Sequence, residues 1–152
     1  MKAIVQRAAE ASVTVENKMI GKINHGFVLF VGFTESDSDK DIHTMVQKLV
    51  HLRIFEDDEG KMNQSLKDVQ GSILSISQFT LYGNVQKGRR PSFVHAAHPE
   101  KAIQLYEAFN QALIAEGVQV ETGEFGAVMD VQLTNAGPVT IPIETIEGKI
   151  IS

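Results

Sequence analysis

Short apolar runs rich in valine, isoleucine and phenylalanine occupy the first quarter of the chain. They cover residues 4–8, 12–15, 19–23 and 26–33, and a polar triplet at 16–18 separates the second run from the third. Each run is too short for a stable helix, and each carries the β-branched and aromatic residues that strands favour. The pattern predicts four β-strands connected as a meander, with a tight turn at 16–18.

Helical spacing of apolar residues occurs in two longer segments. The first covers residues 39–50, and a serine at position 36 or 38 can cap its amino end. The second begins at His98 and extends to about residue 116, with proline in its first turn and Gly117 as its stop. The apolar positions of the two segments are Ile42, Met45, Val46, Leu49 and Val50, then Ile103, Leu105, Tyr106, Phe109, Ala112 and Leu113. We therefore expect two helices, each with one buried face.

The rest of the chain consists of further strand-like runs and turns. The strand-like runs are residues 52–55, 72–79, 118–120, 127–133 and 139–143. A turn at 57–60 separates the first two runs. Strands outnumber helices, and neither an internal repeat nor a Pro/Gly-rich linker divides residues 1–152. We predict a single α/β domain over residues 1–152, with a mixed, curved β-sheet and two main helices.

Composition and charge narrow the range of functions. The chain has no cysteine, which excludes disulfides and cysteine-zinc sites. Its formal net charge of −5 argues against a broad grip on a nucleic-acid backbone, where lysine and arginine supply most of the affinity. The charge is uneven, because residues 87–90 form a compact basic loop whereas residues 35–41 and 56–59 are acidic. We interpret the two acidic segments as solvated turns.

The amino-terminal residues give an expectation about location. Arg7 and Glu10 interrupt the apolar residues of this stretch early. The stretch is too short for a signal peptide or a membrane span. We therefore expect a cytoplasmic protein that has no membrane partner.

The common signatures of strong catalytic chemistry are missing from the sequence. There is no Gly-x-Ser-x-Gly elbow, no His-Glu-x-x-His zinc motif and no glycine-rich phosphate loop. The five histidines, at positions 25, 43, 51, 95 and 98, are scattered. We therefore expect no metal and no cofactor, and a reaction that demands little acid–base power from the protein.

Two polar motifs at the ends of strand-like runs are the most informative part of the chain. The first is Ser77-Gln78-Phe79-Thr80-Leu81, and the second is Asn135-Ala136-Gly137-Pro138-Val139-Thr140. Glycine permits backbone angles that other residues avoid, and the bond before a proline is the one common place for a cis peptide. Taken alone, the second motif could equally be an ordinary turn with a trans peptide bond before Pro138.

Together, the two motifs resemble the signature of the D-aminoacyl-tRNA deacylases, enzymes that hydrolyse D-amino acids from mischarged tRNA. The resemblance covers nearly the whole chain. Its other matching segments are residues 5–7, 11–15, 53–55, 60–63, 90–93 and 122–123, with Phe125 and Met129. It implies a barrel-like sheet, a homodimer with active sites at its interface, and the 3′ end of an aminoacyl-tRNA as the partner.

For a substrate of this kind, we assign catalysis to the first motif. Backbone N–H groups around Gln78, Phe79 and Thr80 would bind the substrate's carbonyl oxygen as it becomes an oxyanion. Thr80 and Ser77 are candidate nucleophiles, although the sequence identifies no base for either hydroxyl. We favour hydrolysis assisted by the 2′-hydroxyl of the terminal adenosine, as the resemblance implies, and an acyl-enzyme at Thr80 is the alternative.

The resemblance assigns selection of the D-isomer to the second motif. A cis Gly137-Pro138 pair, entering the site of the other subunit, would occupy the space of an L-side chain and accept a hydrogen bond from the α-amino group. Arg7 would hold the pair in orientation with its rigid donor fork. Because glycine has no side chain to exclude, glycyl-tRNA, including glycine mischarged on tRNA(Ala), would also be hydrolysed.

Three residues near the final strands are candidates for binding the terminal adenine. Phe125, Ala127 and Met129 offer the apolar and aromatic surface on which an unpaired base stacks. The alternative is that these side chains belong to the core.

Two other functions fit the same residues. One is a non-catalytic dimeric α/β module that binds a ligand, which the missing acid–base groups also allow. The other is an editing domain like those of some threonyl-tRNA synthetases, which would prefer L-serine. Incubation with D-Tyr- or D-Asp-charged tRNA distinguishes the deacylase from the binding module, which would leave the lifetime of the ester unchanged or extend it.

Overall fold

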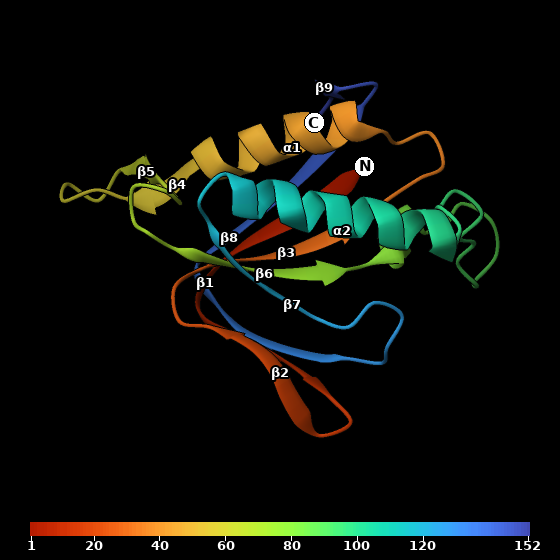
Figure 1. Ribbon diagram of the computed structural model, residues 1–152, viewed down its shortest axis with the longest axis horizontal. Coiled ribbons are helices and arrows are strands. Elements are labelled where there is room, and N and C mark those ends of the chain that lie inside the picture. The colour runs from red at the N-terminus through yellow and green to blue at the C-terminus, as the bar shows by residue number, and fades with distance from the viewer.

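One long strand, β1 (Lys2–Val15), runs through the sheet of the computed structural model, which describes residues 1–152. The sequence predicts two strands here, 4–8 and 12–15, but β1 continues without interruption between them. Its antiparallel neighbour β8 (Asp130–Ile146) follows it along this length, and register shifts on both sides of Ala8 bend the pair. The two strands curve together, and the sheet is a curled half-barrel (Figure 1). The predicted curved, barrel-like sheet is thereby confirmed.

The first three strands do not form the predicted meander. β2 (Lys18–Ile23) pairs with the second half of β1, and β3 (Gly26–Gly32) pairs with the first half. Because β1 is long enough for both, β2 and β3 follow each other along the same edge instead of pairing together. The tight turn is where the sequence places it: Glu16 and Asn17 have φ of 48° and 63°, the left-handed values of a type I′ hairpin turn.

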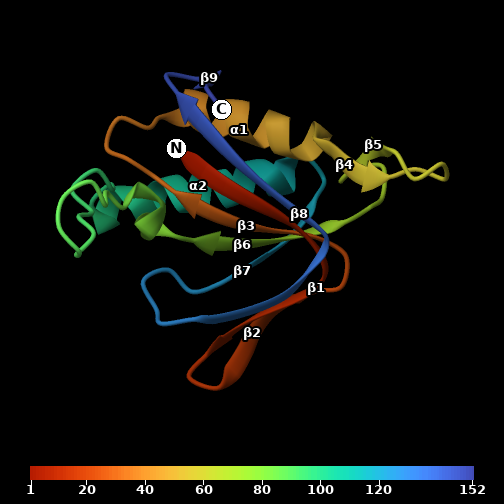
Figure 2. The ribbon, with the colours of Figure 1, turned by 180° about the vertical axis from the view of Figure 1, so that it is seen from behind.

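Two parallel strands extend the sheet, and each follows a helix. β6 (Ser72–Ser77) pairs with β3, and β7 (Gln119–Thr122) pairs with β6. Helices α1 (Asp39–His51) and α2 (Pro99–Ala115) lie in the two crossover connections, since parallel neighbours need a long connection. Both helices cover the same face of the sheet (Figures 1 and 2). The mixed sheet and two main helices confirm the predicted α/β class. Neither helix is long and apolar enough to cross a membrane.

β6 ends at Ser77 and not at Phe79 as predicted. Residues Phe79–Tyr82 form the 3-10 turn η1 instead. Gln78 leaves the extended conformation, with φ −142° and ψ 82°, and the Leu81 N–H bonds back to its carbonyl at 3.3 Å. The apolar run continues into the turn, so the hydrophobic pattern does not show where the strand stops. Phe79 therefore lies on a turn at the end of β6.

β8 is a single strand of 17 residues where the sequence predicts two, 127–133 and 139–143. The ladder with β1 continues on both sides of residues 136–139, which bulge out of it opposite Arg7. A bulge of this kind adds residues to one strand without ending it, and the sequence-based boundary at Gly137-Pro138 was wrong for that reason.

Three short strands complete the fold. β4 (Arg53–Glu56) and β5 (Met62–Ser65) form a separate hairpin, and β9 (Lys149–Ile150) pairs with the end of β8. The sequence predicts β4 within one residue but neither β5 nor β9. The predicted turn joins β4 to β5, where an Asp57 carboxylate oxygen accepts the N–H groups of Glu59 and Lys61.

The core lies on both faces of β3. Phe27 and Leu29 point into the larger apolar cluster beneath the helices, while Val28 points into a smaller cluster on the opposite face with Val13 and Leu74. All five side chains are fully buried. A strand buried on both faces carries a continuous apolar sequence, which explains the unbroken run at 26–33. Each such side chain stabilises the fold by about 1.5–3 kcal/mol.

The acidic segment at 35–41 is not the solvated turn that the sequence predicts. Asp37 and Asp41 are only 4% and 1% exposed. Asp37 accepts a hydrogen bond from the Met1 amino group at 2.6 Å, and Asp41 accepts the backbone N–H groups of Ser38 and Gly148. Burial raises the pKa of Asp37, whereas for Asp41 the two N–H donors outweigh burial and lower the pKa. Both carboxylates hold the start of α1 against its neighbours.

Candidate functional site

A cavity of about 620 Å³ opens at the carboxyl end of β6. Three segments line it: the strand end with Ser77, Gln78 and Phe79, the loop and helix start at 93–102, and the segment 125–131 before and at the start of β8. Most of its surface is apolar, and His98 is the one ionisable residue that lines it. A concave apolar site with a few polar groups at one end is typical of a small-molecule pocket.

The strand end presents backbone groups to the cavity. Gln78 donates its own N–H to the Val31 carbonyl at 2.7 Å, so this predicted oxyanion donor is already used. Phe79 and Thr80 begin η1, and the first N–H groups of a helical turn have no acceptor within it. The backbone at Gln78 lies close to that of Gly32, so a Cβ on Gly32 would be only 2.8 Å from the Gln78 carbonyl oxygen. Two N–H donors of the predicted three thus remain.

The Thr80 side chain lies outside the cavity. Its hydroxyl accepts a hydrogen bond from the Gln78 side-chain amide at 2.6 Å, the residue is exposed, and it is absent from the lining of the cavity. Ser77 does line the cavity. Neither hydroxyl is hydrogen-bonded to a histidine or a carboxylate, so the geometry provides no base for either. No group of three or more His, Asp or Glu side chains is placed to hold a metal ion.

The opposite wall contains the three residues predicted to bind a base. Phe125, Ala127 and Met129 are half-buried and line the cavity together with Gly126. The Phe125 ring lies 6.1 Å from that of Tyr106, which anchors this wall to α2. The structure therefore brings together Ser77, Gln78 and Phe79 with Phe125, Ala127 and Met129, across one cavity.

Sequence reasoning missed the third wall. Phe93, Val94 and Ala97 line the cavity, and the Phe93 ring meets that of Phe79 edge to face at 5.2 Å. The segment at 90–93 belongs to the residues that carry the family resemblance, and this was the one available signal. His98 precedes α2 and donates its backbone N–H to Glu35 at 2.7 Å.

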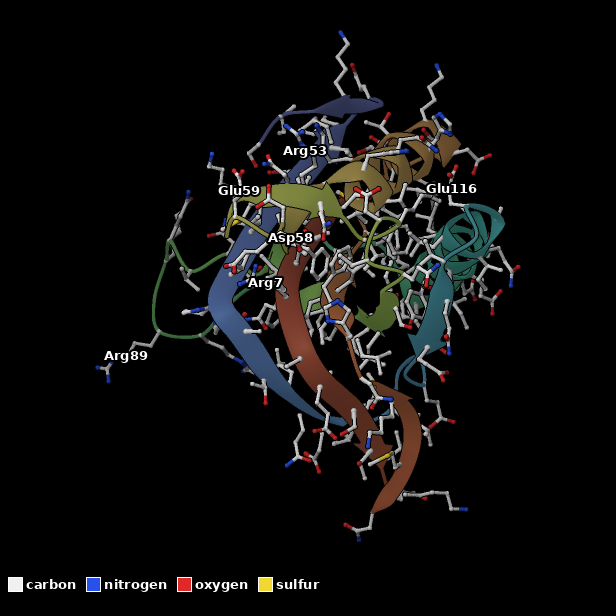
Figure 3. The ribbon with its side chains drawn as sticks, turned by 90° about the vertical axis from the view of Figure 1, so that its left-hand side faces the viewer. Arg7, Arg53, Asp58, Glu59, Arg89 and Glu116 are labelled. Atoms are coloured by element: carbon white, nitrogen blue, oxygen red, sulfur yellow. The ribbon has the colours of Figure 1, made fainter.

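The remaining predicted residues lie outside this cavity. Gly137 and Pro138 are exposed, joined by a cis peptide bond, and absent from its lining. Arg7 is hydrogen-bonded to Ala136, the residue before this pair, and Figure 3 shows Arg7 near the hairpin that carries Asp58 and Glu59. Within one chain, the two predicted halves of the site are therefore separate.

Arg7 fixes the position of the Gly137-Pro138 bulge. Its Nε donates to the Ala136 carbonyl at 2.9 Å and its Nη1 donates to the Ile54 carbonyl at 2.8 Å, while Nη2 lies 3.8 Å from Glu56. Gly137 has φ +124°, and a Cβ there would lie 2.6 Å from Arg7 Nη2. Glycine is needed at this position for both its backbone angle and the closeness of the guanidinium.

The sequence of the whole chain matches known proteins. The family model described as D-Tyr-tRNA(Tyr) deacylase matches residues 4–144. A D-aminoacyl-tRNA deacylase from Bacillus pumilus (strain SAFR-032) is 57% identical over 147 residues, which are 97% of this chain and 100% of that protein. Another from Thermus aquaticus is 56% identical over 147 residues, covering 97% of each.

Two solved structures superpose on nearly the whole of this chain. A protein described as c-Myc DNA Unwinding Element Binding Protein is 41% identical and superposes with a TM-score of 0.90, over 96% of this chain and 99% of that one. A probable eukaryotic D-amino acid tRNA deacylase, 22% identical, superposes with a TM-score of 0.80 over 93% and 97% and shows a common fold. From the whole-length match to the family and its relatives, this chain belongs to the D-Tyr-tRNA(Tyr) deacylase family.

Proposed function

We propose that this chain hydrolyses the ester bond of D-aminoacyl-tRNA and releases the free D-amino acid and tRNA. The observation that supports the proposal is the cavity itself, lined by Ser77, Gln78 and Phe79 on one side and by an apolar wall on the other, within a chain of this family. The cytoplasm, where tRNA is charged and used, is the location that this substrate implies.

The N–H groups of Phe79 and Thr80 stabilise the oxyanion in this proposal. Both residues begin η1, which offers their N–H groups no acceptor, and Phe79 lines the cavity while Thr80 follows it directly in the chain. Hydrogen bonds that strengthen as charge develops on the carbonyl oxygen lower the barrier, and the loss of one such donor typically costs about 100-fold or more in kcat.

Water attacks the ester directly, with help from the substrate. His98 is the one ionisable group in the cavity lining, and it is not hydrogen-bonded to Ser77 or Thr80. The 2′-hydroxyl of the terminal adenosine lies next to the ester and orients the water. The water oxygen bonds to the carbonyl carbon, the bond to the ribose 3′-oxygen breaks, and that oxygen takes the proton that the attacking water gives up. The terminal adenine stacks against the wall formed by Phe125, Ala127 and Met129.

A second copy of the chain supplies the chiral selection. Gly137 and Pro138 are exposed and absent from the cavity of their own chain, so only another chain can receive them. β8 has no neighbouring strand along residues 130–143 on its outer edge, and Phe79 at the cavity mouth is 55% exposed. An open edge and an exposed aromatic ring favour a two-fold homodimer with active sites at the interface. The bulge entering from the partner fills the space of an L-side chain.

Selection of the D-isomer is steric in this proposal, so glycyl-tRNA should also be a substrate. A wall that excludes an L-side chain cannot exclude a substrate with no side chain. Glycyl-tRNA, including glycine mischarged on tRNA(Ala), is therefore a second substrate of the same site.

Side-by-side hydrolysis of D-tyrosyl-, L-tyrosyl- and glycyl-tRNA tests the proposal. We expect rapid loss of the D-tyrosyl and glycyl esters and survival of the L-tyrosyl ester. Protection of all three esters would instead indicate a binding module. Efficient cleavage of the L-ester would contradict the steric selection while leaving the hydrolase activity intact.

A further inference from the structure

A loop of concentrated positive charge stands beside the cavity and takes no part in the proposed reaction. The basic loop consists of Lys87, Gly88, Arg89 and Arg90, and all four residues are exposed. None of its three cationic side chains takes part in an ion pair, although the chain carries a net charge of −5. Three cations left unpaired within four residues of an acidic protein are available to an external anion.

The base of the basic loop is closed by backbone hydrogen bonds. Asn84 and Ser92 exchange two of them, at 2.7 and 2.9 Å, and the Asn84 side chain accepts the Gln86 N–H at 2.9 Å. The residues between this pair protrude as a loop with a fixed base. Figure 3 shows Arg89 at the tip of the loop, directed away from the protein.

The fixed base leads directly into the cavity. Phe93 follows Ser92 and meets Phe79 edge to face at 5.2 Å, and both rings line the cavity. On the other side, Gly83 follows η1, and a Cβ there would lie 3.1 Å from the Phe93 ring. These contacts hold the base of the basic loop next to Phe79, where the turn with the proposed oxyanion donors begins.

We propose that the basic loop binds the backbone phosphates of the tRNA acceptor end, next to the adenosine held in the cavity. This inference rests on the proposed function. Lysine and arginine contact phosphate oxygens without reading bases, which suits an enzyme that accepts more than one tRNA. An ester of adenosine alone ends before these phosphates and gains nothing from the loop.

Kinetics with two substrates of different length test the proposal. The variant is Lys87→Gln/Arg89→Gln/Arg90→Gln, and the substrates are D-tyrosyl-tRNA and D-tyrosyl-adenosine. For tRNA we expect KM to rise about tenfold or more at low salt, and the slope of log KM on log salt to fall by about 2, since each single-strand phosphate contact contributes about 0.7. For the adenosine ester, KM and kcat should stay at the wild-type values.

Two matched variants separate charge from fold. Arg89→Lys keeps the charge and should bind tRNA almost as the wild type does. Lys149→Gln removes another exposed cation, on β9 and away from the basic loop (Figures 1 and 2), and should leave the KM for tRNA unchanged.

Several results would overturn the proposal. Equal KM values for tRNA in the wild type and the triple variant, with equal salt slopes, would do so. An equal loss on both substrates would show a structural role, and dissociation of the triple variant into monomers would show that the loop binds a second copy. Fluorescence anisotropy with uncharged tRNA measures the loop directly. If the wild type hydrolyses neither ester, the proposed function fails, while this binding still tests the loop.

Discussion

Among single residues, Arg7 determines the geometry of the proposed chiral wall. Its side chain is 11% exposed, and its guanidinium joins the Ala136 carbonyl on β8 to the Ile54 carbonyl on β4. A planar fork reaches two acceptors at once, which the single ammonium of lysine cannot do in the same place. Two side chains therefore hold the Gly137-Pro138 bulge: Arg7 from the neighbouring strand, and Asn135, whose Oδ1 accepts the Val139 N–H at 3.1 Å.

Arg7→Lys should lower kcat/KM for D-tyrosyl-tRNA about tenfold or more, because a hydrogen bond from a charged donor contributes about 1.5–3 kcal/mol. Relative cleavage of the L-ester should increase as the bulge loosens. Arg53→Lys, at an exposed arginine outside both motifs, is the control and should behave as wild type. Unchanged discrimination in the Arg7 variant would show that the bulge holds its place without the fork.

Thr80→Val should retain activity within about tenfold of wild type and accumulate no acyl-enzyme. The hydroxyl of Thr80 accepts from the Gln78 amide and faces no base, so its removal costs one side-chain contact. Removal of a true nucleophile costs about 10⁴-fold or more in kcat. A single-turnover assay with labelled amino acid measures both quantities. A complete loss with intact tRNA binding would favour an acyl-enzyme at Thr80.

The sequence predicts site residues well where a motif fixes them and poorly where packing brings them in. Ser77, Gln78 and Phe79 follow one another at the end of β6 and the start of η1, and all three line the cavity together with the wall at 125–129. Thr80 is exposed and does not line the cavity, because the chain leaves the strand and begins η1 at Phe79. The hydrophobic pattern does not show this change. Phe93 and Val94 line the cavity, and the Phe93 ring packs on that of Phe79. The spacing of these residues in the sequence contains no information about this contact.

At the scale of elements, α2 lines part of the cavity with its first turn and contacts two of its walls through Tyr106. Tyr106 donates its hydroxyl to the Ser75 carbonyl on β6 at 2.7 Å, and its ring contacts Phe125 on the opposite wall. Burial raises the pKa of Tyr106, so the phenol stays protonated and remains a donor at all ordinary pH values. One side chain thus connects the helix, the strand that ends at Ser77, and the wall proposed to hold the base.

Tyr106→Phe should lower the free energy of unfolding by about 1–2 kcal/mol, because the Ser75 carbonyl loses the shorter of its two hydrogen bonds and keeps only the one from the Gly123 N–H at 3.3 Å. For a domain of this size, that corresponds to a fall in Tm of about 2–8 °C. Tyr82→Phe is the matched control, since the Tyr82 hydroxyl makes no hydrogen bond within the protein, and its stability should not change. Equal Tm values for Tyr106→Phe and wild type would show that the bond adds nothing net.

Elements with regular periodicity could be predicted, and irregular ones could not. The spacing of Ile42, Met45 and Leu49 places α1 to within a residue. The bulge at 136–139 was interpreted as a break between strands, because local sequence gives the same signal for a turn and for a bulge whose flanking ladders continue. β2 and β3 share an edge of β1 only because β1 is unusually long, and that length depends on its partner β8.

On the scale of the whole molecule, carboxylates that accept backbone N–H groups link stability to pH. The N–H of Lys61 and the side-chain amide of Asn63 lower the pKa of Asp57, and the N–H of Ser65 lowers the pKa of Asp68. Their ordinary value is 3.8. A group with a lower pKa when folded stabilises the fold above its unfolded pKa and loses that effect as the pH falls through the folded value.

The free energy of unfolding should therefore be constant above about pH 5 and decline below about pH 4. Asp37, whose pKa burial raises, acts in the opposite direction and reduces the decline. Urea unfolding at closely spaced pH values measures the curve, and Asp57→Asn should make it shallower. A flat profile down to pH 3 would mean that these hydrogen bonds survive protonation.

The central claim is that each active site takes its cavity from one copy and its Gly137-Pro138 bulge from the other. Two inactive variants test it: Ala127→Trp fills the cavity, and Gly137→Ala places a Cβ 2.6 Å from Arg7 Nη2. After mixing and subunit exchange, half of the dimers contain one copy of each, and one of their two sites is intact. Hydrolysis of D-tyrosyl-tRNA should then recover to roughly a quarter of the wild-type rate, as closed two-fold symmetry requires. A mixture as inactive as its two parents would contradict the shared site.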